Sequence, residues 1–132
     1  MQNMTRLAAP MILAALAVSA CATTRDQTPL PDASNVALGQ KAYADGPIVQ
    51  PVAILEDSRC PMNARCIWAG RVRLKMIWLR PKGNQMFEVT LGEPVQLADG
   101  QFTLTAVHPE KRTDRPIGNR DYRFSFDFQG GL

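Results

Sequence analysis

The sequence predicts an all-β fold: a small single-domain β-sandwich or open barrel of six to seven mostly antiparallel strands, spanning residues 36–130. Three observations support this prediction. Apolar and polar residues alternate with period two over several short segments, which is typical of half-buried strands. Clusters of turn-forming residues separate those segments. After residue 20, no stretch of ten or more residues shows the period of an amphipathic helix.

Residues 1–20 have the pattern of a secretory signal. Arg6 is the only charged side chain before Cys21, and it is followed by an apolar run from Leu7 to Val18. A positive start, a short apolar stretch and small residues at its end are typical of a signal peptide. The apolar run is too short for a membrane span, which needs about 20 residues. We therefore expect the first 20 residues to be removed.

The signal ends in Val18, Ser19, Ala20 and Cys21, and this ending resembles the lipobox of bacterial lipoprotein precursors. The resemblance implies cleavage between Ala20 and Cys21, with acyl chains such as palmitate carried on Cys21. Two or more acyl chains hold a protein stably on a membrane. Because Ala22 follows the cysteine rather than aspartate, the resemblance implies the outer membrane, facing the periplasm. The alternatives are an ordinary signal with a chance cysteine, or a buried helix.

Residues 21–35 are small, polar and proline-bearing, and they predict a flexible tether that carries the lipid. Without residues 1–20, 14 Lys and Arg face 12 Asp and Glu, so the net charge is about +2 and gives no reason to expect nucleic acid as a partner. A run from Arg59 to Lys82 holds seven basic residues and no acidic one. It could meet anionic lipid headgroups, or it could be a solvated strand face.

Six segments carry the strand pattern: 48–56, 71–80, 87–91, 95–97, 102–107 and 122–128. Pro51 indicates an edge strand or a bulge. The Asp99-Gly100 dipeptide suits the tight turn of a hairpin between the fourth and fifth segments. The last segment is the clearest, because four aromatic residues alternate with polar ones on the opposite face: Tyr122, Phe124, Phe126 and Phe128.

The three cysteines divide into one lipid acceptor and one pair. If Cys21 is lipidated, Cys60 and Cys66 remain, and thiols outside the cytosol tend to oxidise. We therefore predict a Cys60–Cys66 disulfide, which contributes about 2.4 kcal/mol by the chain-entropy formula. A redox or metal role is the alternative. The sequence offers little support for either role, because no Cys-x-x-Cys motif is present and the lone His108 lies far along the chain.

The most distinctive segment reads Asp-Ser-Arg-Cys-Pro at residues 57–61 and Cys-Ile-Trp-Ala-Gly at residues 66–70. It resembles a motif of small exported bacterial proteins, over most of residues 36–128, and the resemblance implies an all-β fold without indicating an activity. In a structural interpretation, the bridge pins the loop, Trp68 packs near it, Gly70 allows a bend or close backbone approach, and Asp57 pairs with an arginine. In a functional interpretation, the loop is a candidate binding loop formed by Asp57, Arg59, Arg65 and Trp68.

Catalytic motifs are missing from the sequence: it has one histidine, and neither a Gly-x-Ser-x-Gly elbow nor a glycine-rich phosphate loop. Glu56 and Asp57 are adjacent, so on a strand they point to opposite faces. We expect no enzyme, no cofactor and no metal; a methionine site at Met62, Met76 and Met86 is a weak alternative.

The leading hypothesis is a membrane-anchored envelope lipoprotein that acts as a non-catalytic binding or structural module. The alternative is a protein-binding module, or an inhibitor of an envelope hydrolase, that uses the Cys60–Cys66 loop. Its partners would be an envelope protein or anionic lipid headgroups.

Overall fold

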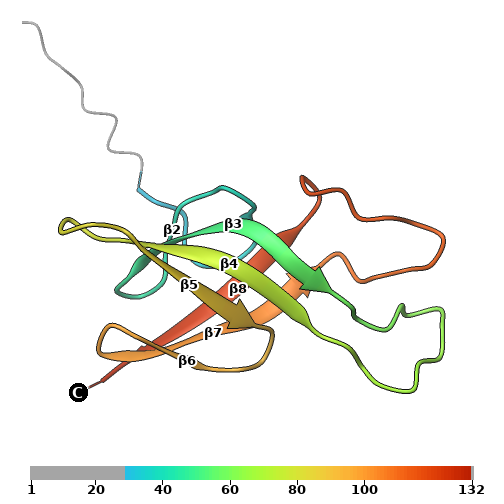
Figure 1. Ribbon diagram of the computed structural model, residues 1–132. Coiled ribbons are helices and arrows are strands. Elements are labelled where there is room, and N and C mark those ends of the chain that lie inside the picture. The colour runs from blue at the N-terminus through green and yellow to red at the C-terminus, as the bar shows by residue number, and fades with distance from the viewer. Residues whose placement is uncertain (1–28, 132) are drawn as a thin grey trace, which may run out of the picture.

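A computed structural model describes residues 29–131, which form two stacked four-stranded sheets (Figure 1). The first sheet has the order β2-β3-β4-β5: Ala42–Tyr43, Ile48–Asp57, Val72–Leu79 and Gln85–Thr90. The second has the order β1-β8-β7-β6: Val36–Ala37, Arg123–Gly130, Gly100–His108 and Val95–Leu97. Neighbouring strands pair antiparallel throughout. The predicted all-β sandwich is confirmed, and the sheets do not close into a barrel.

The number of strands differs from the six to seven predicted, because the structure has eight. The six predicted segments are all strands. The two additional ones, β1 and β2, have two residues each. A strand of two residues is too short to show a period, so the alternation of side chains could not reveal it.

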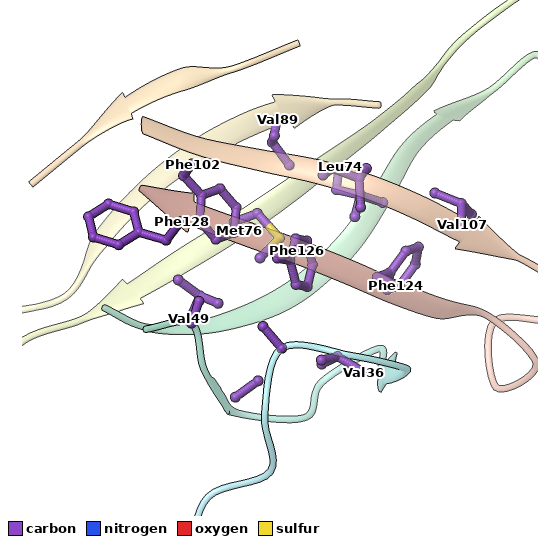
Figure 2. Close-up of a cluster of buried hydrophobic side chains, with 14 of the residues drawn as sticks. Val36, Val49, Leu74, Met76, Val89, Phe102, Val107, Phe124, Phe126 and Phe128 are labelled. Atoms are coloured by element: carbon purple, nitrogen blue, oxygen red, sulfur yellow. The ribbon is translucent and has the colours of Figure 1, made fainter. Parts of the chain in front are cut away.

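The core fills the space between the two sheets (Figure 2). Val72, Leu74 and Met76 of β4 are fully buried. Leu74 and Met76 face the aromatic residues of β7 and β8. The ring of Phe102 on β7 stacks on Phe126 of β8, with 5.1 Å between centroids. All four predicted aromatic residues of the last segment are buried. The period-two interpretation of β4 and β8 is therefore confirmed.

Pro51 lies where β3 departs from regular pairing with β4. The register between the two strands shifts between Pro51 and Ala53, so Pro51 belongs to a bulge in a strand that has neighbours on both sides. The Pro51 side chain is buried, and its carbonyl oxygen accepts a hydrogen bond from Gly39 N at 2.7 Å. Of the two alternatives for Pro51, the structure shows the bulge.

The β6–β7 hairpin forms where it was predicted, but its turn lies one residue earlier. Leu97 pairs with Gly100, which leaves Ala98 and Asp99 as the turn residues, and Ala98 has a φ of 53°. Gly100 is already part of β7. A Cβ atom there would collide with the backbone of Gln129 on β8, so close strand approach, not positive φ, requires glycine at this position.

Residues 31–35 are hydrogen-bonded to the sandwich, although the sequence places them in the tether. Pro31 O accepts a hydrogen bond from Tyr43 N at 2.9 Å, and Ala33 O accepts one from Phe126 N at 2.8 Å. The Ala33 side chain belongs to the core. The predicted signal peptide, the cleavage site at Ala20 and the lipidation site at Cys21 lie outside the described residues.

Candidate functional site

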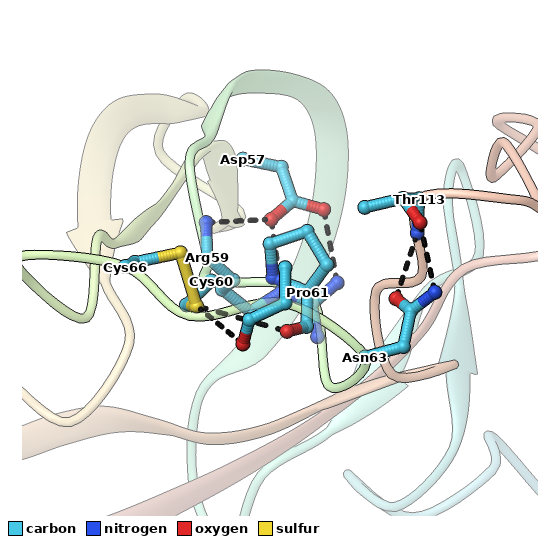
Figure 3. Close-up of a disulfide and its surroundings, with 8 residues drawn as sticks. Asp57, Arg59, Cys60, Pro61, Asn63, Cys66 and Thr113 are labelled. Atoms are coloured by element: carbon cyan, nitrogen blue, oxygen red, sulfur yellow. Dashed lines mark hydrogen bonds and ion pairs between the residues drawn. A yellow bond between two sulfur atoms is a disulfide. The ribbon is translucent and has the colours of Figure 1, made fainter.

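The Cys60–Cys66 loop extends the β3–β4 hairpin past the end of the sheet. Ser58 N donates to Arg71 O at 2.9 Å and Cys60 N donates to Ala69 O at 3.0 Å, so ladder pairing continues beyond both strands. The predicted disulfide between Cys60 and Cys66 is present, with 5.8 Å between the Cα atoms (Figure 3). We refer to residues 58–71 as the disulfide loop.

Gly70 is needed where the disulfide loop returns to β4. Its φ is +70°, and a Cβ atom there would collide with the carbonyl group of Ser58 on the opposite arm of the loop. The arms are held together at this point by Ser58 Oγ, which accepts a hydrogen bond from Arg71 N at 3.0 Å. The close backbone approach expected at Gly70 is confirmed.

Asp57 fixes the base of the disulfide loop. Its Oδ1 accepts a hydrogen bond from Arg59 Nε at 2.8 Å, and its Oδ2 accepts one from Arg59 Nη2 at 2.9 Å (Figure 3). Tyr122 Oη donates to the same Oδ2 at 2.7 Å. Arg59 Nη1 also donates to Val107 O at 3.1 Å. Asp57 and Arg59 thus form a bidentate ion pair. The hydrogen bonds to Val107 and from Tyr122 connect this pair to the second sheet, at the end of β7 and the start of β8.

The electrostatics of this cluster favour a charged carboxylate and a neutral phenol. Partial burial alone raises the pKa of the Asp57 carboxyl, but hydrogen bonds from Arg59 and Tyr122 and the charge of Arg59 outweigh it, and the pKa falls below its usual value. Burial, followed by the hydrogen bond to Asp57 and the negative charge of Asp57, raises the pKa of Tyr122 to about 12. Among residues 29–131, every buried side-chain nitrogen or oxygen has a hydrogen-bond partner.

A second loop, residues 109–121, braces the disulfide loop from the side. Met62 N donates to Lys111 O at 2.8 Å. The side chain of Asn63 makes two hydrogen bonds with Thr113, at 2.8 Å to Oγ1 and 3.0 Å from the backbone N (Figure 3). Lys111 Nζ donates to Asp57 O at 2.6 Å. Contacts from about 50 residues further along the chain thus hold a loop whose local sequence contains its own bridge.

The disulfide loop presents several apolar side chains to solvent. Ile67 is fully exposed, Trp68 is 70% exposed and Met62 is 60% exposed. Arg65 lies on the same exposed stretch. The sandwich core therefore does not bury Trp68, although the bridge, the close approach at Gly70 and the Asp57–arginine pair of the structural interpretation are all present.

The four predicted binding-loop residues divide into two pairs. Asp57 and Arg59 face inward and pair with each other, while Arg65 and Trp68 face solvent. Asp57 therefore takes Arg59, not Arg65, as its partner. Sequence reasoning missed Ile67 as a candidate, although an isoleucine inside a disulfide-closed loop with no strand period was a usable signal.

The basic run from Arg59 to Lys82 is not a continuous cationic strip in space. Arg59 is taken up by Asp57, and acidic residues of β3 and β5 pair with two further arginines: Arg71 with Glu56 at 2.6 Å, and Arg73 with Glu88 at 2.9 Å. The exposed remainder is spread over separate places. This arrangement favours the solvated-face interpretation of most of the run.

No metal centre is visible in residues 29–131, where no three His, Cys, Asp or Glu side chains gather in a way that could hold an ion. The methionine alternative is not supported either: Met76 is in the core, whereas Met62 and Met86 are exposed on the disulfide loop and on β5. Within the same residues, no helix is long and apolar enough to cross a membrane.

No protein-family model, curated protein or solved structure matches the chain.

Proposed function

We propose that this protein is a non-catalytic protein-binding module of the bacterial envelope, anchored to the outer membrane through lipid on Cys21. It presents the disulfide loop to a protein partner. The observation that carries the proposal is the exposure of Ile67 and Trp68 on a loop that is otherwise tightly held. The lipid anchor is supported by the lipobox resemblance of Val18 to Cys21.

The disulfide loop can bury apolar side chains against a partner at a small cost in conformational entropy. Burying one large apolar side chain contributes about 1.5–3 kcal/mol, and Trp68, Ile67 and Met62 are all available for burial. Tryptophan and arginine are among the residues enriched at the hot spots of protein interfaces. The disulfide and the Asp57–Arg59 pair already order the loop. Binding therefore avoids most of the entropy cost of ordering it.

The direction in which the loop points favours a protein over anionic lipid headgroups. The described chain enters beside β2, where Pro31 is bonded to Tyr43, and Figure 1 shows the disulfide loop at the opposite end of the sandwich. A domain that is anchored through its N-terminus then carries this loop on the side away from its attachment. That position suits a partner in the periplasm or on a facing structure.

Site-specific cross-linking in intact cells tests the proposal. A photoreactive amino acid is placed at Ile67, and in a matched control at Met86, an exposed apolar residue on β5. We expect one protein to be cross-linked from position 67 and not from position 86. With that partner protein purified, Trp68→Ala should raise the dissociation constant of the complex at least tenfold, while Met86→Ala leaves it unchanged. Equal cross-linking from both positions, or none from position 67, contradicts the proposal.

Inhibition of an envelope hydrolase is the second candidate, and one observation favours it. A protruding, pre-ordered loop with Ile67 fully exposed at its outer face has the shape to enter a concave active site. The purified chain is added to muramidase and protease assays with cell walls and casein as substrates. Slowed turnover that Trp68→Ala relieves supports the inhibitor. Unchanged turnover rejects the inhibitor while the cross-linking result still decides on binding.

A further inference from the structure

A cleft lies at the end of the sandwich opposite the disulfide loop. Its volume is about 530 Å³, within the range of small-molecule sites. The turn before β3, the end of β4, the β6–β7 turn and the end of β8 contribute to it. Its apolar wall includes Pro47, Ile48, Trp78, Leu79 and Phe128.

The apolar surface of this cleft is recessed. Phe128 and Pro47 are buried, and Ile48, Trp78 and Leu79 are half-buried. None of them belongs to the large apolar side chains that the described chain exposes, in contrast to Ile67 and Trp68 of the disulfide loop. A recessed wall can cover an apolar chain that enters it, but it offers no protruding side chain to insert into a bilayer.

Positive charge predominates at the mouth of the cleft. Arg80 and Lys82 line it, against one acidic residue, Asp99. The Arg80 guanidinium is held in place: Cζ lies 4.6 Å from the centroid of the Trp78 ring, and Nε donates to Gly83 O at 3.1 Å. An arginine fixed above an aromatic wall joins a cation to an apolar surface at one point.

We propose that this cleft binds a free single-chain amphiphile with an anionic headgroup, such as a fatty carboxylate. The alkyl chain lies against Trp78, Ile48 and Phe128. The headgroup lies at the mouth, where Arg80 and Lys82 supply charge-assisted hydrogen bonds. Charge complementarity selects an anion, and the recessed wall selects a free molecule over a membrane surface. This inference does not depend on the disulfide loop or on its partner.

Tryptophan fluorescence tests the proposal, because the chain has two tryptophans and only Trp78 lines the cleft. The full chain is prepared with Cys21→Ser, which removes the lipid acceptor, and with Trp68→Phe, which leaves Trp78 as the only reporter. Dodecanoate is added below its micelle concentration, with dodecanol and dodecyltrimethylammonium as matched probes. We expect a saturable change with dodecanoate, and at least tenfold weaker binding of both matched probes.

The headgroup contacts are tested by substitution. Arg80→Gln/Lys82→Gln should weaken dodecanoate binding at least tenfold, whereas Lys75→Gln/Arg120→Gln, which removes two exposed cations outside the cleft, should not change it. Because Arg80 contacts the reporter ring, affinities are also measured by calorimetry, and folding is checked by circular dichroism. The proposal is overturned by absent dodecanoate binding, by equal affinity for the three probes, or by a response only to phosphatidylglycerol vesicles.

Discussion

Asp57 connects the disulfide loop to the rest of the molecule through both its side chain and its backbone. The carboxylate accepts hydrogen bonds from Arg59 and Tyr122, and the carbonyl oxygen accepts one from Lys111 Nζ. Its side chain is only 9% exposed, and that of Arg59 is 15% exposed. A carboxylate removed from water to this extent is stable because its hydrogen bonds replace hydration. Losing any of them leaves polar groups that water cannot fully reach.

We predict that Asp57→Asn lowers the free energy of unfolding at pH 7 by about 1–3 kcal/mol, because Arg59 loses its charged partner. The folded pKa of Asp57 lies below its unfolded value of about 3.9. Its contribution is therefore fully present above that unfolded value and is lost as pH falls through the folded pKa. Urea unfolding from pH 7 to pH 2 should show the two proteins converging below about pH 4.

The control for this prediction is Asp127→Asn, which changes an exposed carboxylate on β8. This substitution should leave the free energy of unfolding within about 0.5 kcal/mol of the unchanged chain. A difference between Asp57→Asn and the unchanged chain that stays constant down to pH 2 would contradict the assigned role of the charge.

Tyr122 gives the opposite dependence at high pH. Its folded pKa is about 12, above the ordinary value of about 10 for an unfolded chain. The stability that this group contributes is present below about pH 10 and is lost as pH rises toward the folded pKa. We predict that absorbance at 295 nm shows one of the two phenols ionising near pH 12, and that Tyr122→Phe removes that step. An absorbance rise complete by pH 11 would be incompatible with a buried phenol bonded to Asp57.

At the scale of elements, Gly70 shows how a single position allows two arms of a hairpin to meet. Gly70 and Gly92 have similar backbone angles, with φ of +70° and +80°. Their surroundings differ: a Cβ atom at Gly70 meets the Ser58 carbonyl, whereas nothing lies within 4 Å of one at Gly92. Comparing alanine at the two positions separates the cost of the clash from the cost of the left-handed conformation.

We predict that Gly92→Ala lowers the free energy of unfolding by about 1–2 kcal/mol, the cost of a left-handed conformation for a residue with a Cβ atom. Gly70→Ala should lower it further and should also expose the disulfide loop to proteolysis, because the Ser58 arm must move. Thermal unfolding and limited proteolysis measure the two effects. Equal losses of stability and equal cleavage in the two variants would show that the Ser58 contact does not hold the loop.

Strands in which apolar and polar residues alternate over several positions could be predicted from the sequence. Features that depend on contacts between distant residues could not. Tyr122 to Phe128 shows its buried face plainly because each aromatic residue alternates with a polar one. The disulfide followed from counting cysteines. The bracing of Asn63 by Thr113 had no local signal, because it joins residues 50 apart in two loops without a period. The sequence left two alternatives open for Trp68, because a tryptophan can pack beside a bridge or be presented to a partner, and its local pattern does not distinguish them.

At the scale of the whole molecule, the two candidate surfaces differ in kind as well as in place. The disulfide loop protrudes, with apolar side chains presented on an ordered support. The cleft at the other end is recessed, with cations at its mouth. The chain enters beside β2, away from the disulfide loop (Figure 1). A domain anchored through its N-terminus would therefore carry the disulfide loop away from its own membrane.

We predict that, with Cys21 lipidated as proposed, Trp68 stays out of the bilayer when the protein is reconstituted in vesicles. Trp78→Phe leaves Trp68 as the only tryptophan, and brominated phosphatidylcholine quenches only indoles that reach the acyl region. Quenching of Trp68 fluorescence should not exceed that of a control protein with Cys21→Ser. The control carries no lipid anchor and is added to the same vesicles. Strong quenching that requires the lipid anchor would place the exposed Ile67 and Trp68 in the membrane. The disulfide loop would then be a second membrane contact. Insertion into the bilayer, and not a protein partner, would explain why Ile67 and Trp68 are exposed.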